Sequence, residues 1–257
     1  MKELKNIQHI LSHTRKAVEE YDMIENGDKI AVGISGGKDS LTLLCALATM
    51  KRFLKKDYSV IAITIDMGFE ESADFSKIKE LCDELEVEYH VIPTQIYEII
   101  FNVRQEKSPC SLCARMRRGA LHDAAKELGC NKIALGHHFD DVVETFMLNL
   151  FFEGRIGCFS PITYLSRKDV TIIRPLIYAR EKEIAYFASK DCLPVYKAPC
   201  PADGHTERAK MKEFLKPFDL EHPGLYHRIL GAIQRSEIDG FHEDRIDYAE
   251  KKRRKEE

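Results

Sequence analysis

SGGKDS, at residues 35–40, is the most informative segment of this 257-residue sequence. The apolar run before it, KIAVGI (29–34), is typical of a buried strand, and residues 39–54 follow the pattern of a helix. A glycine-rich turn between a strand and a helix gathers backbone amides at the end of that strand. The segment therefore predicts a strand–loop–helix unit with a binding site at its loop.

The residues of this loop are suited to an anionic ligand. Gly36 and Gly37 allow the backbone to approach a ligand closely and to adopt positive φ angles. Successive amides, with a helix N-terminus behind them, form a cradle for phosphate. Asp39 can either cap the helix or hold Mg²⁺ against phosphate oxygens. Two hydroxyls and one cation complete the loop, from Ser35, Ser40 and Lys38.

Strand and helix patterns alternate along most of the chain. Further strands are expected at 59–66, 88–92, 132–136 and 170–176, and further helices at 72–85, 113–128, 139–152 and 180–190. This alternation predicts an α/β fold, a doubly wound parallel sheet covered by helices on both faces. In such a fold ligands bind at the carboxyl ends of the strands.

The two ends of the chain differ from this central unit. Residues 1–25 contain an amphipathic helix, and residues 26–190 form the predicted α/β domain that carries the loop. Prolines and glycines crowd the region after about residue 191, with short helices expected at 205–215 and 224–236. We therefore interpret residues 191–257 as a C-terminal appendage that completes the site or binds a partner.

Composition excludes several classes of protein. The chain has 39 Lys and Arg against 42 Asp and Glu, a net charge of −3, and 44% hydrophobic residues, so global disorder is not expected. No apolar run approaches the roughly 20 residues that span a bilayer, and no apolar leader opens the chain. We expect a cytoplasmic protein with no membrane partner. Near-neutral charge argues against a uniformly basic surface and permits a local basic patch.

Polar residues follow two more predicted strands at the same sheet edge. Asp66 ends the second strand, and GHHFDD (136–141) follows a later strand and begins a helix. Gly136 and His137 are therefore candidates for contact with a ligand bound at this edge. Asp140 and Asp141 fit either of two roles, as contacts to a metal or nucleotide or as charges that favour a helix start.

Eight cysteines in a chain without an export signal suggest metal or redox chemistry more than disulfides. Cys110 and Cys113 form a CxxC pair at a helix start, where the helix N-terminus favours thiolate. Cys200, between two prolines, is the best candidate for a third ligand. Zinc with His205 as fourth ligand and dithiol redox chemistry are alternatives that the spacing leaves open. Small buried hydrophobes are the simplest interpretation of Cys45, Cys82, Cys130, Cys158 and Cys192.

A basic cluster surrounds the cysteine pair. Residues 104–118 contain one acid and five bases, at Arg104, Lys107, Arg115, Arg117 and Arg118. A solvated helix face explains part of this surplus. Beside a nucleotide loop, such a cluster also indicates a phosphate-rich partner such as a nucleic acid. Arg117, four residues after Cys113, is a candidate for holding a phosphate or a substrate base.

The SGGKDS segment resembles the signature of the PP-loop ATP pyrophosphatases. The order SGGKDS, CxxC, GHHxDD, RPL (174–176) and a late Pro-Cys is similar to that of the tRNA 2-thiocytidine synthetase (TtcA) family, over about residues 25–200. The resemblance implies a chain that binds ATP and Mg²⁺, cleaves ATP between the α and β phosphates, and thiolates a cytidine in tRNA. It further implies a [4Fe-4S] cluster held by Cys110, Cys113 and Cys200, with one iron open.

On this resemblance the expected ATP contacts are the loop residues 35–40 with Asp66, Gly136 and His137, and the expected catalytic residues are Asp39, Arg117, Asp140 and Asp141. The expected partners are tRNA and a sulfur donor, either a cysteine desulfurase or free sulfide, and a homodimer is left open. Three alternatives stand beside this prediction. They are another ATP-dependent ligase of the same fold, a related enzyme that removes sulfur from tRNA, and a zinc-stabilised nucleic-acid-binding module.

Overall fold

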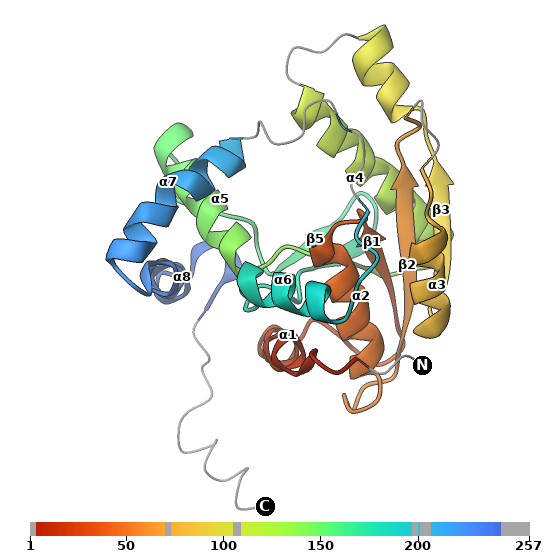
Figure 1. Cartoon of the computed structure of the whole chain (residues 1–257), viewed down its shortest axis with the longest axis horizontal. Helices are drawn as coiled ribbons and strands as arrows, with labels where there is room; N and C mark the ends of the chain where they lie inside the picture. The colour runs from red at the N-terminus through yellow and green to blue at the C-terminus, as the bar shows by residue number, and fades with distance from the viewer. Residues whose placement is uncertain (1–3, 70–72, 105–108, 197–199, 201–206, 243–257) are drawn as a thin grey trace, which may run out of the picture.

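The computed structural model describes residues 4–69, 73–104, 109–196, 200 and 207–242 (Figure 1). Its centre is a six-stranded sheet made of β1 (Asp28–Ile34), β2 (Tyr58–Asp66), β3 (Glu88–Pro93), β4 (Lys132–Ala134), β5 (Ile162–Leu165) and β6 (Val170–Ile173). The strand order is β3-β2-β1-β4-β6-β5, and all neighbours are parallel except β5 and β6. The α/β fold with a doubly wound sheet is thus confirmed, with one antiparallel edge strand added.

Helices connect and flank these strands. The α-helices are α1 (Gln8–Glu20), α2 (Lys38–Met50), α3 (Ser76–Glu84), α4 (Pro109–Glu127), α5 (Phe139–Phe152), α6 (Glu181–Lys190), α7 (Glu207–Glu221) and α8 (Leu225–Arg235). A π-helical turn, η1 (Glu98–Val103), and a 3₁₀ turn, η2 (Ile238–Gly240), complete the described elements. None of the helices in the described part of the chain is long and apolar enough to cross a bilayer.

The sheet separates two apolar cores, because successive side chains of a strand point to opposite faces. In β2, Val60 and Ala62 join the core beneath α2, whereas Ile61 and Ile63 join the core beneath α4. The helix α2 is buried almost all round, since α1 and α6 pack over it. This enclosure fixes the start of α2, and with it the loop 35–40, rigidly against the sheet.

The strand order places that loop where ligands bind in open α/β sheets. From β1 the chain continues to β2 and β3 on one side, and later to β4 and β6 on the other. The reversal leaves a crevice beyond the carboxyl end of β1, between the diverging connections. The segment 35–40 begins at this end, so the topology alone gives it room for a ligand.

Both ends of the chain pack into the same core as the central unit. Met211 of α7 and Leu230 and Ile233 of α8 are buried with the residues of α1 and α5. Figure 1 shows α7 beside α5, on the far side of the molecule from β3. Tyr21, just after α1, packs edge-on against Phe241, with ring centroids 6.2 Å apart. The predicted N-terminal helix and C-terminal appendage therefore share one core with residues 26–190.

Three differences from the predicted elements have clear physical causes. The strand β5 was not predicted, because its four residues ITYL carry too short a pattern to distinguish from a loop. The strand β6 ends at Ile173 and not at 176, since Pro175 has no amide to donate to the ladder. The helix α4 begins at Pro109, four residues earlier than predicted. This early start places Cys110 and Cys113 inside the helix, in its first turns.

Candidate active site

Two serine hydroxyls fold the loop that follows β1. The Ser40 hydroxyl donates to the Gly37 carbonyl at 2.9 Å and accepts from the Ser35 amide at 3.2 Å. The Gly37 amide donates to the Ser35 hydroxyl at 3.3 Å. Gly37 is the N-cap of α2, and no side chain caps this end. The first amides of α2 are therefore open to an anion, as the sequence predicted.

At two positions around the loop, neighbouring backbone atoms lie too close to leave room for any side chain larger than that of glycine. Gly36 has φ +84°, and a Cβ there would lie 3.0 Å from the Tyr196 carbonyl oxygen. A Cβ on Gly136, at the end of β4, would lie 3.0 Å from the Asp39 carbonyl carbon. Any other residue at Gly136 would push the end of β4 away from the start of α2. Gly136 therefore helps to fix the loop, because it packs directly against the backbone of Asp39 and Ser40.

A network of charges surrounds the start of α2. The Lys38 ammonium lies 3.1 Å from Asp39 Oδ1 and 3.2 Å from Glu181 Oε1, and Lys212 also contacts Glu181. Burial disfavours the charge on Lys38, yet Asp39 and Glu181 outweigh it and raise the pKa of Lys38 above its usual value. Asp39 Oδ1 is buried and accepts no hydrogen bond. A carboxylate oxygen held beside the start of α2 in this way, with only charge contacts, fits the predicted Mg²⁺ ligand.

One pocket joins the loop to the cysteine region. Its wall includes Ser35 from the loop, Thr64 and Asp66 from the end of β2, and aromatic rings of Phe69, Phe75 and Tyr196. The lining also includes Cys113, Arg117 and Cys200. Three features predicted from separate parts of the sequence therefore meet in a single cavity. Of the predicted catalytic residues, Arg117 lines this pocket directly.

All three predicted cluster ligands are free thiols. Cys110 is exposed, and Cys113 and Cys200 are partly exposed. Burial raises the pKa of Cys113, the Arg117 guanidinium opposes this, and the Cys200 and Cys110 thiols raise it further. We expected the helix N-terminus to lower the pKa of Cys113 and so to favour its thiolate. Burial has the larger effect and raises this pKa. Cys113 and Cys200 line the same pocket, and Cys110 lies about one turn before Cys113 in α4.

All three predicted ligands are cysteine thiols, which is the donor set of an iron–sulfur cluster. Within the described ranges, no three His, Cys, Asp or Glu side chains are gathered closely enough to hold one metal ion. A single zinc ion needs its ligands converging on one point, at about 2.3 Å for sulfur. A [4Fe-4S] cluster accepts thiolates on different irons, so its ligands stand further apart. His205, the alternative zinc ligand, lies outside the described residues.

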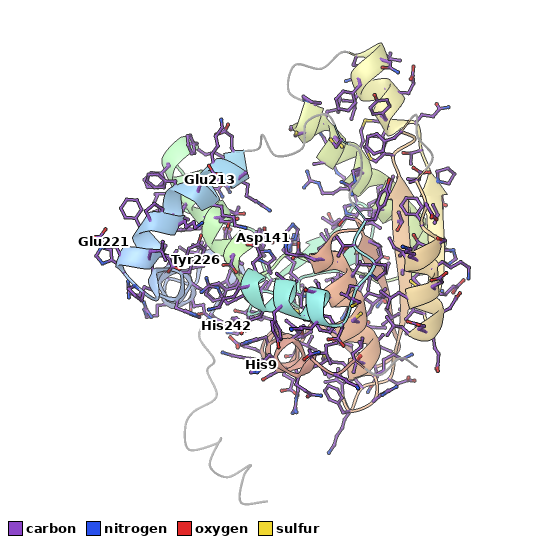
Figure 2. The ribbon with its side chains drawn as sticks, in the orientation of Figure 1. His9, Asp141, Glu213, Glu221, Tyr226 and His242 are labelled. Atoms are coloured by element: carbon purple, nitrogen blue, oxygen red, sulfur yellow. The ribbon has the colours of Figure 1, made fainter. Side chains whose placement is uncertain are left out.

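The segment GHHFDD joins three helices. His138 caps α5, and the Asp141 carboxylate accepts from the His138 amide at 3.0 Å and from Arg208 of α7 at 2.8 Å. Asp140 accepts from Arg180 at 3.0 Å and from the Glu181 amide at 2.7 Å. Figure 2 shows Asp141 on the inner side of α7, whereas Glu221 lies at its outer edge.

These bonds favour a positioning role for both carboxylates. Asp140 holds the start of α6, so that Glu181 faces Lys38 of the loop. Asp141 ties α7 to α5 through Arg208. Neither lines the pocket formed with Cys113 and Cys200. The direct metal or nucleotide contact predicted for them stays a prediction.

His137 lies in an aromatic and cationic environment. Its ring packs against Phe159 with centroids 4.8 Å apart, and Arg174 of the RPL segment lies 5.1 Å from the centre of the same ring. Burial, followed by the charge of Arg174, lowers the pKa of His137 to about 4. The imidazole is therefore neutral near pH 7. It is not among the residues that line the pocket, so its predicted contact with a nucleotide stays a prediction.

The basic cluster is only partly described, because Lys107 lies outside the described residues. Three of its arginines are exposed just before α4 or in its first half, namely Arg104, Arg115 and Arg118. Arg117 lines the pocket. Sequence analysis missed Tyr196, Phe75 and Thr64 as pocket residues. Only Thr64 had a usable signal, since it stands near the carboxyl end of a predicted central strand.

Comparisons with known proteins agree with this geometry. A family model described as the PP-loop domain matches residues 6–218. The tRNA-cytidine(32) 2-sulfurtransferase of Pelobacter propionicus is 41% identical over 236 residues, which are 91% of this chain and 87% of that protein. The enzyme of the same name from Teredinibacter turnerae is 37% identical over 87% of this chain and 74% of its own length.

A solved structure gives a second comparison. The U34-tRNA thiolase NcsA from Methanococcus maripaludis, solved with its [4Fe-4S] cluster, aligns with a TM-score of 0.71 and 26% sequence identity. The alignment covers 88% of this chain and 78% of that one.

Proposed function

This chain belongs to the PP-loop domain family, within the tRNA-cytidine 2-sulfurtransferases, and on that premise we propose that it thiolates a cytidine of tRNA at the expense of ATP. The C2 carbonyl oxygen of cytidine is a poor leaving group. Bond formation between this oxygen and the α-phosphorus of ATP releases pyrophosphate. Sulfur then bonds to C2, and AMP leaves with the oxygen.

A single observation carries this proposal. Ser35 of the nucleotide loop and Asp66 at the end of β2 line one pocket. Cys113, Arg117 and Cys200 line the same pocket. Adenylation acts on the C2 carbonyl oxygen and sulfur transfer on C2 itself, so both sets of groups must reach one bound base. A ligase with a merely structural CxxC pair has no need for thiols in the nucleotide pocket.

The residues of the loop take the phosphate chemistry. Its amides and the N-terminus of α2 stabilise the charge that develops on departing pyrophosphate. Lys38 adds a cation held in place by Glu181. Asp39, whose buried Oδ1 accepts no hydrogen bond and lies beside the Lys38 ammonium, is the ligand we propose for Mg²⁺ on the phosphates. Asp66 and the rings of Phe69 and Phe75 are proposed to border the adenosine.

The thiols take the sulfur chemistry. Cys110, Cys113 and Cys200 are the proposed ligands of a [4Fe-4S] cluster, which supplies an iron without a cysteine ligand where sulfide can bind. Arg117 stands one helical turn after Cys113 and orients a phosphate or the target base. We further propose that the sulfur comes from a cysteine desulfurase or from free sulfide. A homodimeric state and a cytoplasmic location are part of the same proposal.

The tRNA is proposed to approach along the exposed arginines of α4. Arg104, Arg115 and Arg118 are exposed, and residues 109–118 contain no acidic side chain. Such contacts release counterions, so binding weakens as salt rises. This placement leaves the target base next to the pocket that holds Arg117.

Two measurements test the proposal. Anaerobically reconstituted protein is incubated with unmodified tRNA, ATP, Mg²⁺ and sulfide, and the nucleosides are analysed by mass spectrometry alongside the nucleotide products. We expect 2-thiocytidine together with AMP and pyrophosphate in equal amounts. Formation of ADP and phosphate, or tRNA without a thiolated cytidine, would contradict the proposal. Omission of ATP separates thiolation from sulfur removal, which needs no nucleotide.

A further inference from the structure

Tyr196 connects the nucleotide loop to the segment that leads to Cys200. Its amide donates to the Gly36 carbonyl at 2.9 Å. Its carbonyl oxygen, Cβ and ring occupy the space that a Gly36 side chain would need, at 3.0–3.1 Å. Its ring packs edge-on against Phe75, with centroids 5.5 Å apart. Backbone and side chain of Tyr196 are therefore both held against the loop and its neighbour.

The residues before Tyr196 are anchored as well. Leu193 is buried, and its amide donates to the Ala188 carbonyl at the end of α6. The segment 193–196 thus runs from α6 to the nucleotide loop with a fixed point at each end. Four residues then remain to Cys200, which at full extension span about 14 Å. Tyr196 consequently limits the region in which the Cys200 thiol can lie.

Tyr196 and Cys200 also line the same pocket as Ser35 and Cys113. Cys200 is far from Cys113 in the sequence, and no described element of the sheet carries it. Tyr196 is the nearest described residue before Cys200 in the chain, and its amide is bonded to the nucleotide loop.

We propose that Tyr196 is a positioning residue, which holds the Cys200 segment against the nucleotide loop so that the third cluster thiol faces the ATP phosphates. This inference rests on the proposed function, because it assigns the use of Cys200 to the cluster. Tyr196 would then link the nucleotide loop to the cysteine ligands of the cluster. Ligands that order the loop at Gly36 also order Cys200, and the coupling acts equally in the other direction.

Thiol accessibility tests the placement without any cluster. The apoprotein is alkylated anaerobically with iodoacetamide, and the rate at each cysteine is read by mass spectrometry. Cys110 and Cys192, which are exposed, serve as internal references. Tyr196→Ala removes the ring, Tyr196→Pro removes both the ring and the amide donor, and Tyr196→Phe keeps both. The matched control is Tyr186→Ala, on the exposed face of α6.

We expect Tyr196→Ala and Tyr196→Pro to raise the alkylation rate of Cys200 at least about threefold, because the segment opens locally. The rates at Cys110 and Cys192 should not change. Tyr196→Phe and Tyr186→Ala should match the parent. A merely structural role would lower the melting temperature without singling out Cys200. Unchanged Cys200 rates in both disruptive variants would overturn the proposal.

Iron and sulfide contents give the second readout. After anaerobic reconstitution, Tyr196→Ala and Tyr196→Pro should hold clearly less iron than the parent and approach Cys200→Ala, whereas Tyr196→Phe should hold as much as the parent. Full iron retention in both disruptive variants would overturn the role of Tyr196. A parent protein that binds no iron would instead contradict the proposed function, and the alkylation rates would still decide where Tyr196 places Cys200.

Discussion

The two halves of the pocket are built in different ways. The nucleotide half is fixed by short backbone and hydroxyl bonds around Ser35, Gly37 and Ser40, at the end of a strand buried on both faces. The cysteine half combines the first turns of α4 with a segment far away in the sequence, and its thiols are exposed or partly exposed. The first half is preorganised by the fold, whereas the second depends on a few anchors.

This difference suits two kinds of chemistry. Phosphate transfer is accelerated by donors that are already in place when charge develops. A cluster site has to admit iron and sulfide, so it needs solvent access and ligands that can adjust. The predictions below follow from assigning rigidity to one half and adaptability to the other.

The largest effect is expected from Asp39. Replacement by Ala removes the proposed Mg²⁺ ligand and one partner of Lys38, and should lower tRNA-dependent pyrophosphate release by about 10²-fold or more. The fold should be intact, because the core beneath α2 is untouched. Circular dichroism and a thermal melt check this, and Asp169→Ala, on an exposed turn, is the matched control. Pyrophosphate release within twofold of the parent would remove Asp39 from the phosphate site.

A smaller effect is expected when two exposed arginines of the cysteine half are replaced by acids. Arg115→Glu with Arg118→Glu should weaken tRNA binding by about tenfold or more at low salt and should flatten its salt dependence. ATP affinity should change little. The matched control is Lys51→Glu with Arg52→Glu, at the opposite end of α2. Filter binding across a salt series measures this, and equal losses in both double variants would place the tRNA elsewhere.

Gly136 tests how rigid the nucleotide half is. Ala at this position brings a Cβ to 3.0 Å from the Asp39 carbonyl carbon, so the start of α2 has to shift. We expect a loss of about 1–3 kcal/mol in unfolding free energy, typical of overpacking. ATP affinity should fall as well. Gly129→Ser is the control, because Gly129 has a positive φ and no atoms near its Cβ position. This variant adds backbone strain without any contact with the loop. Denaturant unfolding and calorimetric ATP titration give the two values.

The smallest effect concerns pH and the packing of α5. Burial, followed by repulsion from Asp141, raises the pKa of Glu144 to about 8. The folded state therefore holds a proton that the unfolded chain releases near its ordinary pKa. Stability from this group is complete below about pH 4.5 and is lost as pH rises through about 8. Glu144→Gln should raise the melting temperature by a few degrees at pH 8.5 and by less at pH 5. An equal shift at both pH values would contradict the assignment.

The nucleotide half could be predicted from sequence because its chemistry is local. SGGKDS lies between a strand and a helix, so its position in the fold followed from periodicity alone. The convergence of Asp66 with this loop followed from parallel strands ending at one edge. Gly136 was singled out as well, although as a nucleotide contact; the structure shows its packing against Asp39.

The cysteine half could be predicted only in part. Cys110, Cys113 and Cys200 were selected by spacing and by flanking prolines, yet no pattern marks Tyr196, whose anchor is a backbone bond to a loop far along the chain. The bonds of Asp140 to Arg180 and the Glu181 amide were hidden for the same reason. Periodicity reports which face of an element is buried, and it carries no information about which distant partner a polar group meets.

The joining of an ATP loop to three cluster thiols is the central claim, and metal analysis of cysteine variants tests it most directly. Iron, sulfide and zinc are measured in anaerobically purified parent protein and in Ala variants of Cys110, Cys113, Cys200 and the buried Cys130. The account predicts a brown parent with iron and sulfide, loss of iron in the first three variants, and retention in Cys130→Ala. Stoichiometric zinc without sulfide, or iron retained in Cys200→Ala, would contradict it.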